Sequence, residues 1–161
     1  MPIFNAKGDI FEVGFKERFD LIVVFWHVGL NFLRFYWDNF RSGHSSLAAI
    51  DDPFSDLGEK FTEYASGGKY IVFVSEVKNN GMSDSDLSKA FKRVFEHGIK
   101  LGLKTVITNG VSNIDHSTNS AANALSNRNR VVFIRSLLSP YETNFKKIML
   151  INLNDSFINP N

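Results

Sequence analysis

The sequence predicts an α/β fold of three layers, in which helices cover both faces of a central sheet. Short, continuous apolar runs recur along the chain, and segments with the apolar spacing of helices separate them. The composition is that of a globular protein, with 161 residues of which 43% are hydrophobic and 22% charged. No internal repeat, low-complexity tract or linker interrupts the chain, so we expect a single domain over residues 1–161.

The strands are predicted from runs that stay apolar at every position instead of alternating. Such runs are typical of strands buried on both faces of a sheet. A β-sandwich with one face in water would alternate apolar and polar residues, so the pattern argues against that fold. The predicted strands are Asp20–Trp26, Tyr70–Val74, Thr105–Thr108, Val131–Ile134 and Ile148–Ile151.

The clearest helix follows Leu87, where apolar residues recur at steps of three and one and charged residues fill the other face. Ser83 with Asp86 three residues later resembles a capping box, and Gly102 suits the end of the helix. We expect His97 on the exposed side near this end, where a cation complements the helix dipole.

Three further helices are expected between the strands. One begins at Asp52-Pro53, with an N-cap followed by proline at the first helical position, and ends at Gly67-Gly68. Its apolar stripe consists of Phe54, Leu57, Phe61 and Tyr64. The other two cover Leu30–Phe40 and a shorter segment from Ser117 or Thr118 to Leu125.

Composition and charge exclude several classes of function. With 18 Lys+Arg against 17 Asp+Glu, the net charge of +1 gives no overall field that would recruit nucleic acid or an anionic membrane. The absence of cysteine excludes disulfides, thiolate zinc sites and cysteine nucleophiles. The first ten residues lack a basic region followed by an apolar run, and Leu21–Trp26 is too short to span a bilayer. We therefore expect a cytoplasmic protein without membrane or nucleic-acid partners.

The common catalytic and cofactor motifs are also missing. The chain has no phosphate loop, no G-x-G-x-x-G after a strand and no G-x-S-x-G elbow. Its four histidines show no metal-ligand spacing, so we expect no bound cofactor or metal.

Ligands of α/β sheets bind in loops that follow the carboxyl ends of the strands. Three such positions carry polar residues: His27–Gly29, Ser75-Glu76 and Asn109–His116. The last runs into a helix start, so its backbone N–H groups could face an anion such as phosphate. It could equally be an ordinary connecting loop, in which Asn and Asp serve as turn formers.

The N-terminal motif Lys7-Gly8-Asp9-Ile10 stands shortly before the buried run Asp20–Val23. This arrangement resembles the opening of macro domains, where a G-D-I strand end precedes a D-A-I-V strand. The order of later elements is similar over nearly the whole chain, including the helix with Glu96-His97-Gly98 and the loop with Val111-Ser112. The resemblance implies a mixed sheet between helices. It also implies binding of ADP-ribose or a related nucleotide, which some family members hydrolyse from proteins, nucleic acids or acetate.

The resemblance also assigns roles to individual residues. Asp9 would read the adenine amino group, and the backbone amide of Ile10 would join it. His27 stands at the position of the catalytic asparagine, and His27 and Asn31 would face the distal end of the ligand. Gly29, in place of the family's glycine-rich loop, is also expected to bind the ligand. The residues expected to bind phosphate are Gly110, Val111, Ser112, Asn113 and Ile114.

The sequence departs from the macro-domain pattern in both phosphate loops. The N-A-A-N motif reads Val24-Phe-Trp-His27, and the loop after it keeps a single glycine. The second loop, I-S-T-G-x-x-G in the family, reads Val111–Ser117 without either glycine. Since glycines let the backbone approach a diphosphate closely, Ile114 and His116 would crowd it.

Three interpretations of function remain open at this point. The first is a divergent macro-like domain that binds ADP-ribose or an NAD-derived metabolite, without efficient catalysis. The second is an ADP-ribosyl hydrolase in which His27 and Asp115 act as an acid–base pair. The third is a protein-interaction or assembly module with a protein partner, whose pocket has filled with aromatic residues such as Trp26 and Phe32.

Overall fold

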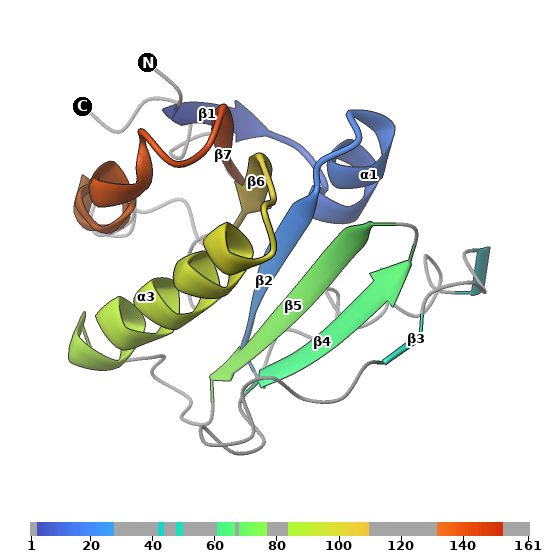
Figure 1. The fold of residues 1–161 in the computed structure, drawn as a ribbon, viewed down its shortest axis with the longest axis horizontal. Coiled ribbons are helices and arrows are strands. Elements are labelled where there is room, and N and C mark those ends of the chain that lie inside the picture. Colours follow the sequence, from blue (N-terminus) through green and yellow to red (C-terminus); the bar gives the residue numbers. More distant parts are fainter. Residues whose placement is uncertain are drawn as a thin grey trace, which may run out of the picture.

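The computed structural model describes residues 3–27, 42–43, 48–49, 61–66, 68–76, 84–109 and 132–152. Figure 1 shows its strands with the helices packed around them. The helices are α1 (Ile10–Lys16), α3 (Asp84–Lys100), a helix over residues 132–138 and the 3-10 turn η2 (Ser139–Tyr141). The strands are β1 (Ile3–Lys7), β2 (Leu21–His27), β3 (Ala48–Ala49), β4 (Phe61–Ser66), β5 (Lys69–Glu76), β6 (Thr105–Thr108) and β7 (Lys147–Asn152).

The strands form one mixed sheet of seven strands in the order β1-β7-β6-β2-β5-β4-β3. Neighbouring strands from β1 to β5 in this order are parallel, whereas β4 and β3 run antiparallel to their neighbours. The predicted strands Asp20–Trp26, Tyr70–Val74, Thr105–Thr108 and Ile148–Ile151 correspond to β2, β5, β6 and β7. The mixed α/β sheet expected from the sequence is therefore confirmed.

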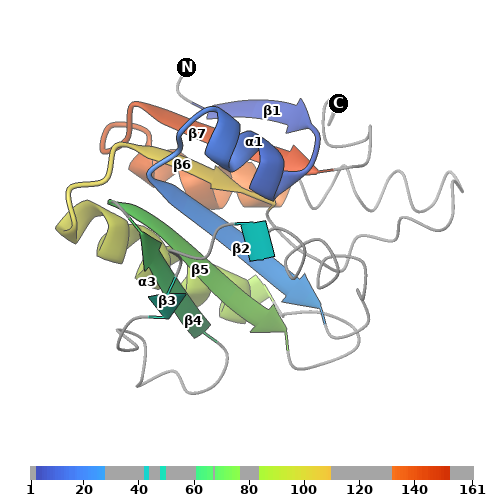
Figure 2. The ribbon, with the colours of Figure 1, turned by 90° about the vertical axis from the view of Figure 1, so that its right-hand side faces the viewer.

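Two hydrophobic cores lie on opposite faces of the sheet. Side chains alternate along β2, so Leu21, Val23 and Phe25 enter one core while Ile22 and Val24 enter the other. The first core is covered by α3 and the helix over residues 132–138, and the second by α1. Figure 2 shows α1 in front of the sheet and α3 behind it. This double burial explains why the strand sequences are apolar at every position.

Helix α3 begins and ends close to the expected residues. It covers Asp84–Lys100, and Gly102 follows with φ of 76°, a left-handed conformation that glycine adopts without strain. Its apolar face is buried against the first core through Leu87, Ala90, Phe91, Val94 and Phe95. The spacing rule therefore located the helix and its buried face correctly.

The strand predicted at Val131–Ile134 is wrong, because the chain is helical over residues 132–138. A run of four apolar residues does not distinguish a strand from a buried helix. The helical signal lay further along, where Ile134 and Leu138 are buried and Phe133 and Leu137 pack against the same core. These residues recur at steps of one and three, which is helical spacing.

The helix predicted from Asp52-Pro53 to Gly67-Gly68 is wrong in its last part, because Phe61–Ser66 forms strand β4. Ser66 pairs with Lys69 across a two-residue connection in which Gly68 has φ of 83°. The Gly-Gly pair therefore marks a hairpin turn between two strands instead of a helix end. Residues 52–60 of this prediction lie outside the described residues, as do the helices expected at Leu30–Phe40 and Ser117–Leu125.

Helix α1 was not expected from the sequence. It has only seven residues, which is too short for a clear hydrophobic period. Its glycine is needed for packing, since a Cβ on Gly14 would lie 2.8 Å from Cδ1 of Ile22. The close approach of α1 to β2 thus depends on an amino acid that intrinsic propensity disfavours in helices.

Candidate functional site

The carboxyl ends of β1, β7, β6, β2 and β5 share one edge of the sheet, because these strands are parallel. Figure 2 shows several of their arrowheads pointing to this edge. After β2 the chain leads to β3, β4 and β5 on one side, whereas after β6 it leads to β7 on the other. The point between β2 and β6 is therefore a topological switch point, where open α/β sheets bind their ligands.

Asp9 lies at this edge, directly after β1 and directly before α1. Gly8 makes the turn with φ of 153°, and a Cβ there would come within 3.3 Å of Val13 and 3.4 Å of Ile151. The Asp9 side chain then acts as the N-cap of α1, because Oδ1 accepts hydrogen bonds from the N–H of Phe11 (2.8 Å) and of Glu12 (3.1 Å). The carboxylate is thus fixed at a helix start.

Capping uses only one of the two carboxylate oxygens. Both hydrogen bonds end on Oδ1, and among the described residues Oδ2 of Asp9 accepts none. Ile10 is the first residue of α1, and its side chain is buried in the second core. Its side chain is therefore not placed to meet a ligand, and the role of its backbone amide stays a prediction.

Asn109 is the other polar residue fixed at this edge. Asn109 directly follows β6 and is only 5% exposed. Its side chain reaches across to β2. Oδ1 accepts from the N–H of Phe25 at 2.8 Å, and Nδ2 donates to the carbonyl of Phe25 at 3.1 Å. From the sequence, Asn109 is only the first residue of a polar loop. Its contact with Phe25 was not predicted, because the two residues lie 84 positions apart in the chain.

His27 is the last residue of β2 and therefore also lies at the carboxyl edge. Its backbone pairs with Glu76 at the end of β5. The remaining residues proposed for the site lie outside the described residues, namely Gly29, Asn31, Gly110, Val111, Ser112, Asn113, Ile114 and Asp115. The structure thus brings Asp9, Ile10 and His27 to one edge of the sheet, and their roles remain predictions.

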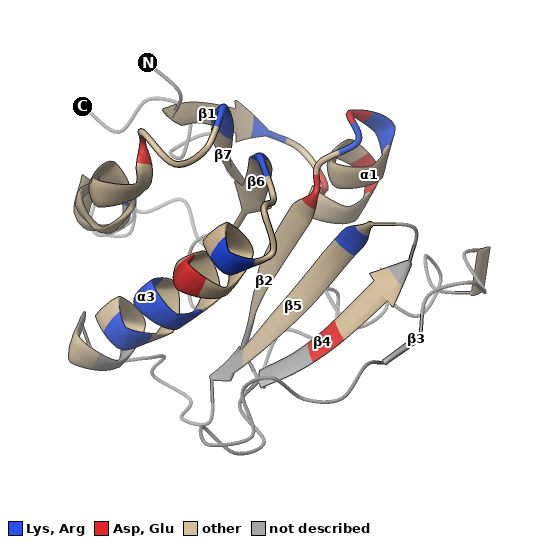
Figure 3. Cartoon of the chain, in the orientation of Figure 1, with Lys and Arg blue, Asp and Glu red and all other residues tan. Residues whose placement is uncertain are grey.

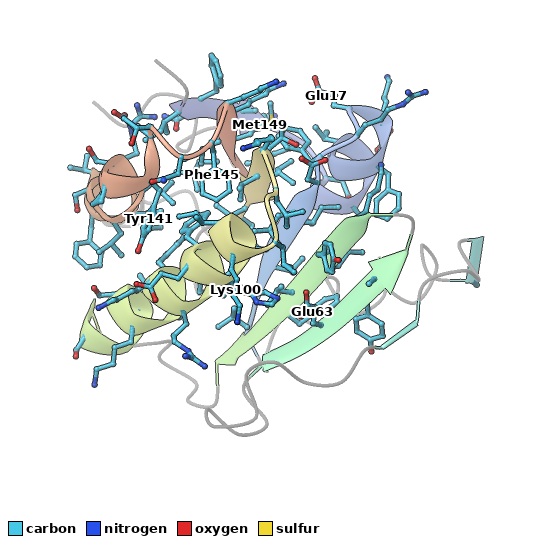
Figure 4. The ribbon with its side chains drawn as sticks, in the orientation of Figure 1. Glu17, Glu63, Lys100, Tyr141, Phe145 and Met149 are labelled. Carbon is cyan, nitrogen blue, oxygen red and sulfur yellow. The ribbon has the colours of Figure 1, made fainter. Side chains whose placement is uncertain are left out.

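His97 is not the exposed helix-end residue expected from the sequence. Its side chain is 17% exposed, and Nε2 lies 3.2 Å from both carboxyl oxygens of Glu63, whose own side chain is fully buried. Figure 4 shows Glu63 on β4. This pair joins α3 to strand β4 of the sheet. Because it lies away from the strand ends, we infer that it stabilises the fold and does not belong to the site.

Charge and ligand geometry give no sign of a metal site or a large ionic surface in the described part of the chain. There, no group of three or more His, Asp or Glu residues could hold a metal ion. In the view of Figure 3, both acidic and basic residues occur on α1 and on α3. None of the helices in the described ranges is long and apolar enough to cross a membrane.

No model of a protein family matches the sequence, and no curated protein sequence matches it significantly. Solved structures do match the fold. A macrodomain from Trypanosoma brucei superposes with a TM-score of 0.55 at 12% identity, covering 99% of this chain and 65% of that one. Crystals of that macrodomain with ADP-ribose (TM-score 0.55, 12% identity, 99% and 67% covered) and with ADP (0.54, 12%, 98% and 66%) match equally.

These matches extend over nearly all of this chain, whereas the chain spans about two thirds of the length of the macrodomain chains. At such low identity the likeness concerns the fold. It agrees with the mixed sheet and the helices on its two faces. The chain has a macro-domain-like fold.

Proposed function

We propose that this protein binds an adenine nucleotide such as ADP-ribose at the carboxyl edge of its sheet, without efficient catalysis. The observation that carries the proposal is Asp9, a carboxylate fixed beside this edge with Oδ2 free of hydrogen bonds among the described residues. An oxygen that only accepts hydrogen bonds suits the amino group of adenine. The Trypanosoma brucei macrodomain, solved with ADP and with ADP-ribose, supports this choice of ligand.

In this proposal the ligand lies along the strand ends. Asp9 accepts a hydrogen bond from the adenine amino group, and the N–H of Ile10 donates to a ring nitrogen beside it. The segment from Gly110 to Ile114 meets the diphosphate through backbone N–H groups. His27, Gly29 and Asn31 face the distal ribose.

The direct test is a calorimetric titration with ADP-ribose and with its inosine analogue, in which an oxygen replaces the adenine amino group. We expect saturable binding of ADP-ribose and weaker binding of the analogue, because two acceptor oxygens would then face each other. The absence of saturable heat and of a melting shift with ADP-ribose would refute the proposal. Equal affinity for the two ligands would show that Asp9 does not read the base.

We expect no efficient turnover of ADP-ribosylated substrates. Catalysis requires accurate placement of the reacting ribose, and an error of about 1 Å can cost about a hundredfold in rate. Both glycine loops of the family pattern are altered here, and Val24-Phe-Trp-His27 replaces N-A-A-N. The measurement is release of free ADP-ribose from a modified peptide, followed by chromatography. Release well above background that disappears in His27→Ala would instead establish a hydrolase.

A further inference from the structure

The pairing of β2 with its two neighbours ends at different points. With β5 it continues to the pair His27–Glu76, but with β6 it stops at the pair Val23–Thr108. If the backbones of β2 and β6 continued to pair in the same register, residues after Thr108 would supply the hydrogen-bond partners of the N–H and carbonyl of Phe25. In the described residues the side chain of Asn109 makes both of these bonds.

A carboxamide has the same donor and acceptor as a peptide group, so Asn109 can replace one step of backbone pairing. This replacement satisfies two buried backbone groups of β2 that would otherwise lose their partners. The side chain therefore holds β2 and β6 together at the place where the pairing of their backbones has already ended.

The opposite end of the same strand pair is also joined by side chains. Asp20 Oδ2 accepts from the N–H of Lys104 (2.9 Å) and of Thr105 (3.3 Å), and the N–H of Asp20 donates to Oγ1 of Thr105. The pair β2–β6 is thus fixed at both ends by side-chain hydrogen bonds to backbone. Only the Asn109 end lies at the edge of the proposed nucleotide site.

We propose that Asn109 is a positioning residue of the nucleotide site, which sets the separation of the carboxyl ends of β2 and β6 through its two hydrogen bonds to Phe25. The proposal rests on the proposed function, since it concerns the affinity of that site for ADP-ribose. Asn109 contacts Phe25. It therefore affects binding through the positions of the two strand ends.

The test compares Asn109→Ala with Asp20→Ala, because each variant loses two hydrogen bonds that join the same two strands. We expect similar losses in melting temperature. Asn109→Ala is expected to weaken ADP-ribose binding about tenfold or more, because it displaces the strand ends. Asp20→Ala, at the far edge, is expected to stay within about threefold of the wild type. The near-isosteric Asn109→Asp lacks the donor to the Phe25 carbonyl and is expected to change affinity in the same direction.

Hydrogen exchange of individual amides, measured by NMR, provides a readout that does not depend on the ligand. In Asn109→Ala the Phe25 amide should exchange faster, while the amides of Leu21–Val23 keep their protection. If the Phe25 amide exchanges faster but affinity stays within about threefold of wild type, the positioning proposal fails and the proposed function stands. Equal losses of affinity in Asn109→Ala and Asp20→Ala would also overturn it, since general destabilisation would then explain both. If the wild-type protein does not bind ADP-ribose, the proposed function fails and the positioning role fails with it.

Discussion

Substitution of Asp9 separates the capping of α1, which the structure shows, from the base recognition proposed for the same carboxylate. Oδ1 caps α1 through two N–H groups, whereas Oδ2 is the atom proposed to accept from adenine. Asp9→Ala removes both oxygens. Asp9→Asn retains an oxygen for the cap but presents an NH₂ group to the base, which cannot accept a hydrogen bond.

The two variants should therefore differ in stability and agree in affinity. Loss of an N-cap side chain costs about 1 kcal/mol, while Asn and Asp are nearly equivalent caps, so we expect Asp9→Ala alone to lower the free energy of unfolding. A hydrogen bond to a charged group contributes about 1.5–3 kcal/mol. Loss of that bond should weaken ADP-ribose binding about 10- to 150-fold in both variants.

The assay combines urea unfolding with calorimetric titration of ADP-ribose. Glu12→Gln is the matched control, because it removes a carboxylate from the first turn of α1 without touching the cap. It should keep near-normal affinity if the effect of Asp9 is specific. Wild-type affinity in Asp9→Asn would refute base reading by Asp9, and a stability loss in Asp9→Asn equal to that of Asp9→Ala would refute the capping argument.

Three further predictions concern the packing of the sheet. Removal of the partner of buried Glu63 by His97→Ala should cost about 3 kcal/mol in urea unfolding, whereas adding Glu63→Leu should recover part of that loss. Gly14→Ala should lower stability by about 1 kcal/mol, because overpacking against Ile22 exceeds the gain in helix propensity, and it should become neutral or stabilising in an Ile22→Val background. Burial, and secondly the charge of Glu96, raises the pKa of Tyr141 above 10.0. The stability contributed by the neutral hydroxyl is therefore complete below about pH 10 and is lost as the pH rises further. Between about pH 9 and 11 the melting temperature should fall less steeply with pH in Tyr141→Phe than in the wild type.

The central strands were predictable because they are buried on both faces. Leu21–Phe25 must be apolar at every position to serve two cores, and this leaves a clear pattern in the sequence. The short element α1 left no such pattern. The apolar run Val131–Ile134 suits a strand and a buried helix equally well, and the chain is helical from residue 132. At Phe61–Ser66, pairing with strand β5 decided the conformation instead of local propensity.

The candidate site was predictable only where a local motif marks it. Asp9 could be singled out because Gly8, Asp9 and Ile10 are adjacent and resemble the G-D-I motif of macro domains, whereas the turn and the helix cap at this motif became evident only in the structure. Asn109 could not be found in this way. Its role depends on two hydrogen bonds to the backbone of Phe25. Since every residue carries the same carbonyl and nearly every one the same N–H, the sequence does not reveal which residue Asn109 contacts.

In the proposed site, base recognition and contact with the diphosphate would depend on different parts of this chain. Asp9 is held by a glycine turn, a helix cap and the second core, and Asn109 is held by the backbone of β2, so both depend on the packing of the sheet. Packing of this kind tolerates extensive exchange of apolar residues when volume and pattern are kept. A macro-domain-like fold at 12% identity is consistent with that tolerance. The resemblance to macro domains implies, by contrast, that contact with a diphosphate uses glycines in two loops, of which this sequence keeps one in the first loop and none in the second. We therefore expect the adenine end of the site to persist where the catalytic end has changed, so that affinity for ADP-ribose and its turnover separate in this protein.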